Sequence, residues 1–435
     1  MMDKFIIQGG NILEGSIEIS GAKNSILALA LTSILTDQNI ILDNVPYLTD
    51  VVTMCELLSN LGINIIAKNN DIIENIKNSK ADKLQLTLNS SNIKNFHSPY
   101  EIAKKMRASF WVLGPLIARF GEAEVSLPGG CAIGTRQIDL HLETLKLMGA
   151  ELIIKDGYVY GSIKGKLKNI HYTFNKVSVG ATINAITSAC LADGESVFTN
   201  CAHEPEIVDL CHLLAKMGAK IEGVGTSRLV IHGVDKLNGA RHATIPDRIE
   251  IGTYIAAVGM TGGSLTLNNV DHNIIENISD KFIESGIQIV KSSDSSITVT
   301  KNNIIKSVNI QTMPYPGFPT DMQAQFMALM CLSNGVSSIA ENMFENRFMH
   351  IPELQRMGAD INICHNLATI KGINKFKGAN VMATDLRASV CLVLAGLAAE
   401  GTTIIDRIYH IDRGYCRIEK KLNAVGANIE RIISN

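Results

Sequence analysis

The residue with the clearest capacity for covalent or acid chemistry is Cys131, which lies in the segment LPGGCAIGTRQ at 127–137. This segment contains three glycines and is unusually long, because 28 residues separate Gly121 from Gly149 whereas 23 to 25 separate the matching glycines elsewhere. A glycine-rich loop is typical of a mobile lid, and a neighbouring cation such as Arg136 favours the thiolate form of a cysteine. Two interpretations stay open: a catalytic thiol on a lid, or a small side chain that fills space in a flexible loop.

The best candidate for a general base is Asp321. It follows the segment PYPGFPT at 314–320, whose prolines and glycine predict a rigid turn that aims the carboxylate. Asp247 and Asp385 also stand at the start of apolar helical segments. Aspartate is a standard N-cap at such positions, so we favour the capping role for these two residues.

Basic residues recur at equivalent places near the starts of the predicted helices. They are Lys23, Arg107, Arg136, Lys176, Arg387 and Arg413, with Arg347 in the segment ENRFMH. The chain has 40 Lys and Arg against 42 Asp and Glu, so it has no basic surplus of the kind that nucleic-acid binding requires. Cations concentrated at helix starts indicate a polyanionic ligand, although for any single residue a surface ion pair or helix cap explains it equally well.

A short pattern, apolar-x-x-x-Gly-x-x-apolar, recurs six times along the chain. Its glycines are Gly62, Gly149, Gly218, Gly286, Gly358 and Gly426, at spacings of 68 to 87 residues. Glycine supplies the left-handed residue that ends a helix, and the alternating apolar residues after it begin a strand. A period near 70 predicts six copies of one supersecondary unit, each with a helix, a strand, an amphipathic helix, the glycine and a further strand.

Each copy also contains a strongly apolar helix whose only polar turn is the first one. These segments lie at 22–35, 104–120, 178–194, 246–260, 319–332 and 383–401. Such helices belong in an interior, and their N-termini attract anions. We expect two domains of three repeats each, one at 1–22 plus 246–435 and one at 23–245 carrying the Cys131 loop, with the active site in the cleft between them.

Composition limits the class of protein. The chain of 435 residues is 46% hydrophobic, too long for a single core and too apolar to be disordered. Its nine cysteines include no CxxC pair, and no apolar run approaches the roughly 20 residues of a membrane span. The N-terminus lacks a signal-peptide pattern, so we expect a cytoplasmic location. The segment 68–97, rich in Asn, Lys and Ser, predicts an extended surface loop or hairpin.

Several longer motifs resemble one family closely. They are GAKNS, MRASFWVLGPLIARFGEAEVSLPGGCAIGTRQIDLH, KVSVGAT, IPDRIE, PGFPTDMQAQF, FENRFMHIPEL, ATDLRAS and RIYHIDRGYCRIE. They are similar to those of the UDP-N-acetylglucosamine 1-carboxyvinyltransferases, also called UDP-N-acetylglucosamine enolpyruvyl transferases, and the resemblance runs from residue 3 to 431. It implies an α/β fold, an inside-out α/β barrel of two pseudo-threefold domains, within the enolpyruvyl transferase superfamily that includes the shikimate-pathway enzyme.

The resemblance implies that the enolpyruvyl group of phosphoenolpyruvate is transferred to the 3-hydroxyl of UDP-N-acetylglucosamine by addition and elimination, with release of phosphate. This is the first committed step of peptidoglycan precursor synthesis. By resemblance, Cys131 is the general acid and forms a covalent adduct, and Asp321 accepts the hydroxyl proton. Lys23, Arg136 and Arg413 would hold the phosphate, and Arg347 and Arg387 the carboxylate. A cysteine at position 131 also implies sensitivity to the epoxide antibiotic fosfomycin.

The resemblance further implies a set of residues that contact the UDP-sugar. They are Lys23, Asn24, Arg107, Arg136, Gln137, Ile138, Asp139, Leu140, Lys176, Val177, Ser178, Val179, Asp321 and Met343. Two positions depart from the family pattern: Gln137 stands where proline is expected, and Met343 where a branched aliphatic residue is usual. The first change loosens the expected lid hinge, whereas a backbone contact at the second would survive.

Two rival functions remain: transfer to shikimate 3-phosphate, against which the KVSVGAT, TRQIDLH and PGFPTDMQAQF motifs argue, and a catalytically silent paralogue that binds UDP-sugar as a sensor. A pure scaffold of repeats fits less well, because solenoids do not collect charge at helix starts. We expect no cofactor, no metal, no nucleic-acid partner and no membrane span. The oligomeric state stays open, and a monomer is compatible with the sequence.

Overall fold

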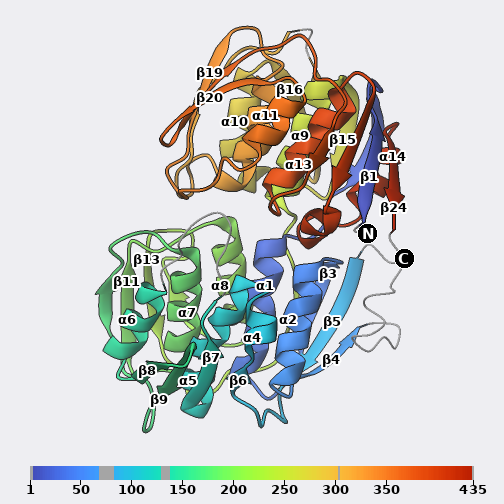
Figure 1. Cartoon of the computed structure of the whole chain (residues 1–435). Helices are drawn as coiled ribbons and strands as arrows, with labels where there is room; N and C mark the ends of the chain where they lie inside the picture. The colour runs from blue at the N-terminus through green and yellow to red at the C-terminus, as the bar shows by residue number, and fades with distance from the viewer. Residues whose placement is uncertain (1–2, 68–82, 129–137, 302–303, 434–435) are drawn as a thin grey trace. The chain divides into compact units, whose positions relative to one another are not determined.

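The computed structural model describes residues 3–67, 83–128, 138–301 and 304–433. The chain divides into two compact units (Figure 1). Of the described residues, unit 1 contains 3–20 and 246–433, and unit 2 contains those between 21 and 245. The chain therefore begins in unit 1, builds all of unit 2 and then returns to unit 1.

The described part of unit 2 contains three four-stranded sheets with the orders β14-β3-β5-β4, β6-β7-β9-β8 and β10-β11-β13-β12. The strands are β3 (Ile40–Pro46), β4 (Asn64–Ala67), β5 (Lys83–Asn89), β6 (His97–Ser98), β7 (Glu122–Ser126), β8 (Glu151–Lys155), β9 (Tyr158–Ser162), β10 (His171–Thr173), β11 (Glu195–Thr199), β12 (Lys220–Glu222), β13 (Arg228–His232) and β14 (Ala240–Ala243). The helices are α1 (Lys23–Leu31), α2 (Thr49–Asn60), α4 (Tyr100–Ala103), α5 (Leu113–Phe120), α6 (Asp139–Leu147), α7 (Val179–Ala189) and α8 (Pro205–Lys216), with 3-10 turns η1 (Thr32–Leu35) and η2 (Arg107–Val112).

The described part of unit 1 repeats this plan with the sheet orders β16-β17-β15-β2, β18-β19-β21-β20 and β22-β23-β1-β24. The strands are β1 (Lys4–Gln8), β2 (Leu13–Glu18), β15 (Gly263–Asn268), β16 (Ile287–Ser293), β17 (Ser296–Lys301), β18 (Ile310–Gln311), β19 (Val336–Ala340), β20 (Asp360–Cys364), β21 (Leu367–Lys371), β22 (Asn380–Met382), β23 (Thr402–Asp406) and β24 (Asn428–Ile432). The helices are α9 (Arg248–Thr261), α10 (Glu276–Glu284), α11 (Gln323–Met330), α12 (Ile351–Arg356), α13 (Ala388–Ala398) and α14 (Ile418–Asn423), with 3-10 turns η3 (His272–Ile274), η4 (Thr320–Met322) and η5 (Ile408–Arg413).

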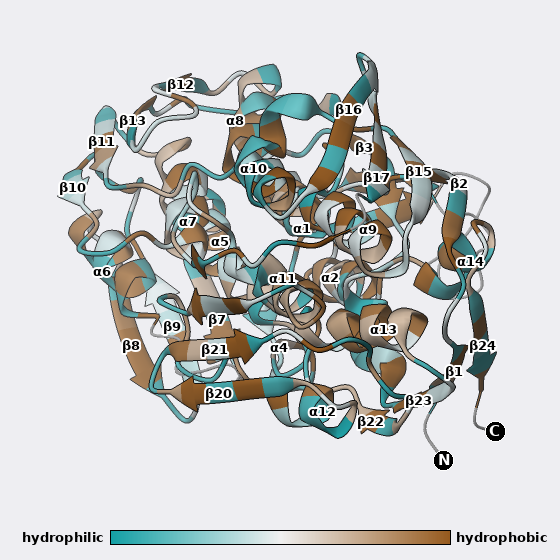
Figure 2. Cartoon of the chain, turned by 90° about the horizontal axis from the view of Figure 1, so that it is seen from above, coloured by the Kyte–Doolittle hydropathy of each residue, from teal (hydrophilic) through white to brown (hydrophobic). Residues whose placement is uncertain are grey.

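Every sheet has one pattern: a parallel pair at one edge and antiparallel pairs across the rest. β20 and β21 form a tight hairpin in which Cys364 pairs with Leu367, and both strands contain hydrophobic as well as hydrophilic residues (Figure 2). The strands β1 and β2 complete two sheets whose other members lie hundreds of residues later. The sequence predicted fewer strands per repeat, because it missed the second hairpin strand and the short parallel edge strand.

The six repeat glycines end helices as predicted. Gly62, Gly149, Gly218, Gly286, Gly358 and Gly426 all have φ between +95° and +106°. At Gly218, for example, its own N–H bonds to the carbonyl of Ala215, and the N–H of Ala219 bonds to Leu214. These two hydrogen bonds satisfy carbonyl groups that have no partner within the last turn of the helix, and they turn the chain into the following strand.

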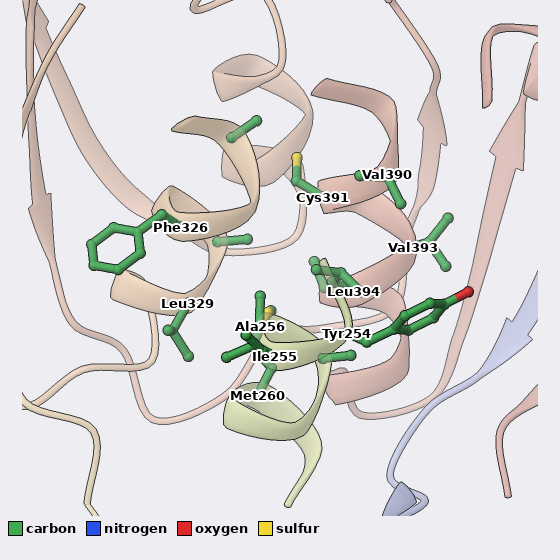
Figure 3. Packing of buried hydrophobic residues seen from close by; sticks show 14 of the residues in the cluster. Tyr254, Ile255, Ala256, Met260, Phe326, Leu329, Val390, Cys391, Val393 and Leu394 are labelled. Carbon is green, nitrogen blue, oxygen red and sulfur yellow. The ribbon is translucent and has the colours of Figure 1, made fainter. Parts of the chain in front are cut away.

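The core of unit 1 is built on α9, α11 and α13, which contact one another. Figure 3 shows Tyr254 and Ile255 of α9, Phe326 of α11, and Cys391 and Leu394 of α13, with the rings of Phe326 and Tyr254 directed to opposite sides of the helix group, and all five side chains are fully buried. Burying a large apolar side chain contributes about 1.5–3 kcal/mol, so these helices anchor the unit. The prediction of buried helices with polar first turns is confirmed for these three.

The helix predicted at 104–120 is interrupted. Its first part forms the 3-10 turn η2, and the α-helix α5 begins only at Leu113. Pro115 is the third residue of α5, where its missing N–H is not needed for an intrahelical bond, whereas a helix begun earlier would place it in the interior. Within 68–97, residues 83–89 form the hairpin strand β5, and 68–82 lie outside the described residues. Among the described helices, none has the length and apolar character needed to cross a bilayer.

Candidate active site

The starts of the three central helices of unit 1 carry the charged residues that the sequence singled out. Asp247 caps α9, where its Oδ1 accepts from the N–H groups of Ile249 and Glu250 at 2.8 and 3.1 Å. Asp385 accepts in the same way from the N–H groups of Arg387 and Ala388, both at 2.8 Å. The capping role predicted for these two aspartates is confirmed.

Arg387 joins the three helix starts. Its side chain is 3% exposed, its Nε lies 3.4 Å from Oδ2 of Asp321, and its Nη2 lies 3.8 Å from Oδ2 of Asp247. The guanidinium also stands 5.5 Å from the ring centre of Tyr415. Burial by itself would lower the pKa of Arg387, but the charges of Asp247 and Asp321, together with Tyr415, raise it above its ordinary value. Arg387 is therefore a permanent buried cation.

Asp321 is held between two guanidinium groups. Its Oδ1 lies 2.9 Å from Nη2 of Arg347, on the opposite oxygen from the one that faces Arg387. The side chain of Asp321 is 25% exposed, whereas those of Arg347 and Arg387 are 5% and 3% exposed. Neighbouring cations favour the ionised carboxylate. Asp321 is also the most exposed of these three charged side chains.

One buried polar side chain without a partner among the described residues belongs to Gln323, two residues after Asp321. Both of its side-chain amide atoms make no hydrogen bond to another described residue. The Gln323 side chain is fully buried. Because buried polar groups normally have partners, this end of the helices offers donors and acceptors to a polar ligand or to water.

A hydrogen-bonded network behind Asp321 fixes its backbone. Nε2 of Gln325 donates to the carbonyl oxygen of Asp321 at 3.1 Å and lies 3.1 Å from Oη of Tyr415. The Tyr415 hydroxyl is in turn 2.9 Å from Oγ1 of Thr253 on α9. The sequence analysis missed this network, whose only signal was the polar residues inside an apolar helix.

In unit 2, Lys23 is the first residue of α1 and forms an ion pair with Asp50 of α2. Their Nζ and Oδ2 atoms are 2.8 Å apart, with side chains 9% and 2% exposed. A buried cation requires such a partner. Asp50 was not singled out from the sequence, where it looks like an ordinary acidic residue in the first turn of a helix.

Arg107 begins the turn η2, which contacts both α1 and α7. Burial, together with the charge of Arg107, lowers the pKa of His141 to about 3. The Nδ1 of His141 lies 2.6 Å from Nδ2 of Asn184, and Oδ1 of the same amide accepts from the N–H of Gly114. Because the amide oxygen faces Gly114, the amide nitrogen must donate to His141, which is neutral.

The other predicted residues have the following places. Ile138 precedes α6, and Asp139 and Leu140 lie in its first turn. Ser178 caps α7 by accepting from the N–H of Ala181, with Lys176 and Val177 before it and Val179 as the first helical residue. Asn24 follows Lys23 in α1, and Arg413 ends η5 half-buried. Cys131, Arg136 and Gln137 lie outside the described residues.

The contacts within unit 1 thus bring together Asp321, Arg347 and Arg387. A separate surface pocket of about 760 Å³ in this unit is lined by α10, β18, β19 and the turn at Tyr315 and Pro316, and it contains none of the predicted residues. Among the described residues, no group of three or more His, Cys, Asp or Glu side chains has the geometry to hold a metal ion.

Comparison with known proteins identifies the family. Residues 7–422 match the family described as EPSP synthase (3-phosphoshikimate 1-carboxyvinyltransferase). The chain is 54% identical over 431 residues to the UDP-N-acetylglucosamine 1-carboxyvinyltransferase of Rickettsia bellii (strain OSU 85-389) and 55% identical to that of Rickettsia prowazekii (strain Madrid E), covering 99% of this chain and 100% of each relative.

Solved structures agree on the fold. The enolpyruvyl transferase NikO from Streptomyces tendae superimposes with a TM-score of 0.87 at 21% identity, and all of both chains is covered. An EPSP synthase from Acinetobacter baumannii gives a TM-score of 0.74 at 16% identity over 99% of this chain and 100% of that chain. The family model, the full-length relatives and the fold together place the chain among the carboxyvinyl (enolpyruvyl) transferases. Within that class, the chain belongs to the UDP-N-acetylglucosamine 1-carboxyvinyltransferase family.

Proposed function

We propose that this chain transfers the enolpyruvyl group of phosphoenolpyruvate to the 3-hydroxyl of UDP-N-acetylglucosamine and releases phosphate, as the first committed step of peptidoglycan precursor synthesis. The observation that carries the proposal is the identity of 54–55% over 431 residues to the two Rickettsia enzymes named for this transfer. The charged cluster of unit 1 supports it independently, because both substrates are anions and the reaction needs a base.

The chemistry assigns a task to each part of that cluster. Removal of the 3-hydroxyl proton needs a carboxylate in its basic form, and Asp321 is the partly exposed carboxylate of the cluster. Arg347 and Arg387 keep it ionised and offer fixed positive charge to the carboxylate of phosphoenolpyruvate. Fixed charges in a poorly solvated site need no reorganisation as the reaction proceeds, which lowers its barrier.

The remaining assignments rest on the family resemblance. Cys131 delivers a proton to the methylene carbon and forms the covalent adduct, and Lys23, Arg136 and Arg413 hold the phosphate that is expelled. Asn24, Arg107, residues 137–140, residues 176–179 and Met343 bind the UDP-sugar. The proposal thus requires residues of both units to act in one reaction. We also propose that the two domains form an inside-out α/β barrel fold with the active site in the cleft between them. The reaction would take place in the cytoplasm and would need no cofactor.

The test is phosphate release from phosphoenolpyruvate with UDP-N-acetylglucosamine as acceptor, for wild type and Cys131→Ser. We expect release by wild type and a loss of at least about 100-fold in the variant, because a positioned acid typically contributes that much. Fosfomycin should add its mass to the wild-type protein but not to Cys131→Ser, as measured by intact mass spectrometry. A folded wild type that releases no phosphate would overturn the proposal.

The second candidate function is transfer to shikimate 3-phosphate, which the description of the matching family model favours. The full-length identity to UDP-N-acetylglucosamine enzymes argues against it, since the EPSP synthase structure shares only 16% identity. Phosphate release measured with each acceptor separates the two. The silent paralogue is excluded if either acceptor supports turnover.

A further inference from the structure

Glu341 is a buried carboxylate in unit 1 that the reaction itself does not use. It follows strand β19 and is 4% exposed. Its Oε1 accepts from the hydroxyl of Thr312 at 2.9 Å and from the N–H groups of Met343 and Phe344 at 2.8 and 3.2 Å. Its Oε2 accepts from the hydroxyl of Thr320 at 2.9 Å. Four donors converge on one carboxylate, and charge-assisted bonds of this kind are roughly twice as strong as neutral ones.

These donors come from the segments that carry two residues of the charged cluster. Thr320 is the first residue of η4 and directly precedes Asp321. Met343 and Phe344 begin the segment that leads to Arg347. Asp321 and Arg347 then meet again through their ion pair of 2.9 Å. Glu341, Thr320, Asp321 and Arg347 therefore form a closed loop of contacts between two stretches of chain.

The same carboxylate also ties both stretches to the sheet. Thr312, which directly follows β18, donates its hydroxyl to Glu341 and accepts from the N–H of Asn342 at 2.9 Å. The side chain of Asn342 is held in turn by Asn366 at 3.0 Å, in the hairpin between β20 and β21. The loop of contacts is thus anchored to β18 and to this hairpin, and the position of Asp321 depends on it.

We infer that Glu341 is a positioning residue, which sets the Asp321 carboxylate against Arg347 and fixes the backbone at Met343 without touching either substrate. The inference rests on the proposed function, because its consequence is the orientation of the base toward the sugar hydroxyl. Misplacement of a reacting group by about 1 Å can cost on the order of 100-fold in rate. A residue that holds the base in place should therefore affect turnover more than substrate affinity.

The test removes the direct hydrogen bond between Glu341 and the residue that precedes the base. Thr320→Val keeps the shape of the side chain and deletes the hydroxyl, whereas Thr320→Ser keeps the hydroxyl. We expect kcat for phosphate release to fall about 10- to 100-fold in Thr320→Val, with the KM of each substrate within about threefold of wild type. Thr320→Ser should restore most of the activity.

The matched control is Thr403→Val in β23. Thr403 is fully buried, and its hydroxyl makes no hydrogen bond to another described residue. It lies outside the charged cluster, so the same chemical change should leave kcat and both KM values unchanged. Thr320→Val and Thr403→Val with equal kcat would overturn the inference, as would a Thr320→Ser variant no better than valine.

A substitution of Glu341 itself provides a second measurement. Glu341→Ala removes all four bonds, and Glu341→Gln keeps one oxygen for the two N–H donors but loses the charge. We expect kcat to decrease in the order wild type, Gln, Ala. A crystal structure of Thr320→Val should show the Asp321–Arg347 distance lengthened beyond 2.9 Å, and an unchanged distance would contradict the inference. Inactivity of the wild type would instead refute the proposed function and leave this structural result standing.

Discussion

At the residue scale, the most informative side chain is Asp321. Two arginines lie against its two oxygens, and neighbouring cations favour the ionised form of a carboxylate. A hydrogen bond from Gln325 to the Asp321 carbonyl and one from Thr320 to Glu341 hold the short turn η4 that carries this carboxylate.

Replacement of Asp321 by asparagine tests its role directly. Asp321→Asn keeps the shape and hydrogen-bonding capacity but removes the base. We expect kcat to fall by about 10²- to 10⁴-fold, the range that positioned acid–base groups contribute, and the melting temperature to fall modestly because Arg347 and Arg387 lose a counter-charge. The measurement is phosphate release together with thermal unfolding by circular dichroism.

The control for this substitution is Asp294→Asn. Asp294 is fully exposed and only 3.1 Å from Lys291, a surface pair of little energetic value. Its replacement should change neither turnover nor melting temperature. Full activity in Asp321→Asn would exclude Asp321 as the base.

His141 makes stability depend on pH. Burial and the charge of Arg107 lower its pKa to about 3 from the ordinary 6.5. As pH falls, the imidazole of His141 is protonated near pH 6.5 in the unfolded chain but only near pH 3 in the folded chain. This histidine therefore contributes stability that is fully present above pH 6.5 and is lost as pH falls below it. Between pH 6.5 and 5 the loss amounts to about 2 kcal/mol.

His141→Asn removes this titration. We expect the free energy of unfolding of wild type to fall more steeply than that of the variant between pH 7 and 5, as measured by urea denaturation. His171→Asn, at an exposed histidine of β10, should keep the wild-type dependence. A constant gap between wild type and His141→Asn across this range would contradict the prediction.

At the element scale, the repeat is defined by how its helices end. The six glycines share one left-handed conformation, yet their surroundings differ. A Cβ added at Gly358 would meet nothing within 4 Å, whereas one added at Gly62 would lie 2.9 Å from the carbonyl oxygen of Asn92. The first position tests backbone strain alone, and the second tests strain together with a clash.

Alanine substitutions separate these two effects. Gly358→Ala should lower the free energy of unfolding by about 1–2 kcal/mol, the cost of a left-handed residue with a Cβ. Gly62→Ala should cost at least about 1 kcal/mol more, since overpacking against backbone adds to the strain. Urea denaturation of both variants measures the difference. An equal decrease in the free energy of unfolding for the two variants would mean that the backbone near Asn92 moves to accommodate the added Cβ at little cost.

At the scale of the whole molecule, the two units differ in which parts of the chain build them: unit 2 comes from the middle of the chain and unit 1 from both ends. The described residues of unit 2 all lie between 21 and 245, whereas those of unit 1 come from 3–20 and 246–433. Strand β1 lies inside its sheet between β23 and β24, and β2 forms the edge beside β15. The first residues of the chain are therefore structural members of unit 1.

This arrangement predicts that residues 21–245 fold alone. They contain all strands of three sheets and their own buried helices, so circular dichroism and a dispersed amide NMR spectrum should show native-like structure. The stretch 246–435 without residues 1–20 should not fold, because it lacks a central strand and exposes the core beneath it. Neither piece should release phosphate. A disordered 21–245 would contradict the prediction.

Much of the architecture was readable from local patterns. The glycines at helix ends, the buried helices and the capping aspartates each follow from the chemistry of a few adjacent residues. The short edge strands were missed because two or three residues carry too little periodicity to be recognised, and β22 at 380–382 is an example. The interruption before α5 was missed because Pro115 lies in an otherwise continuous apolar segment.

By itself, the sequence determined the repeat, the family and the residue types at the helix starts, since these depend on spacing along the chain. Only the tertiary structure decided which charges meet. Lys23 pairs with Asp50, Arg387 lies between Asp247 and Asp321, and Glu341 joins two distant segments. Each pairing depends on the order in which strands enter sheets and helices pack, and electrostatic contacts formed across such distances leave no local signal in the chain.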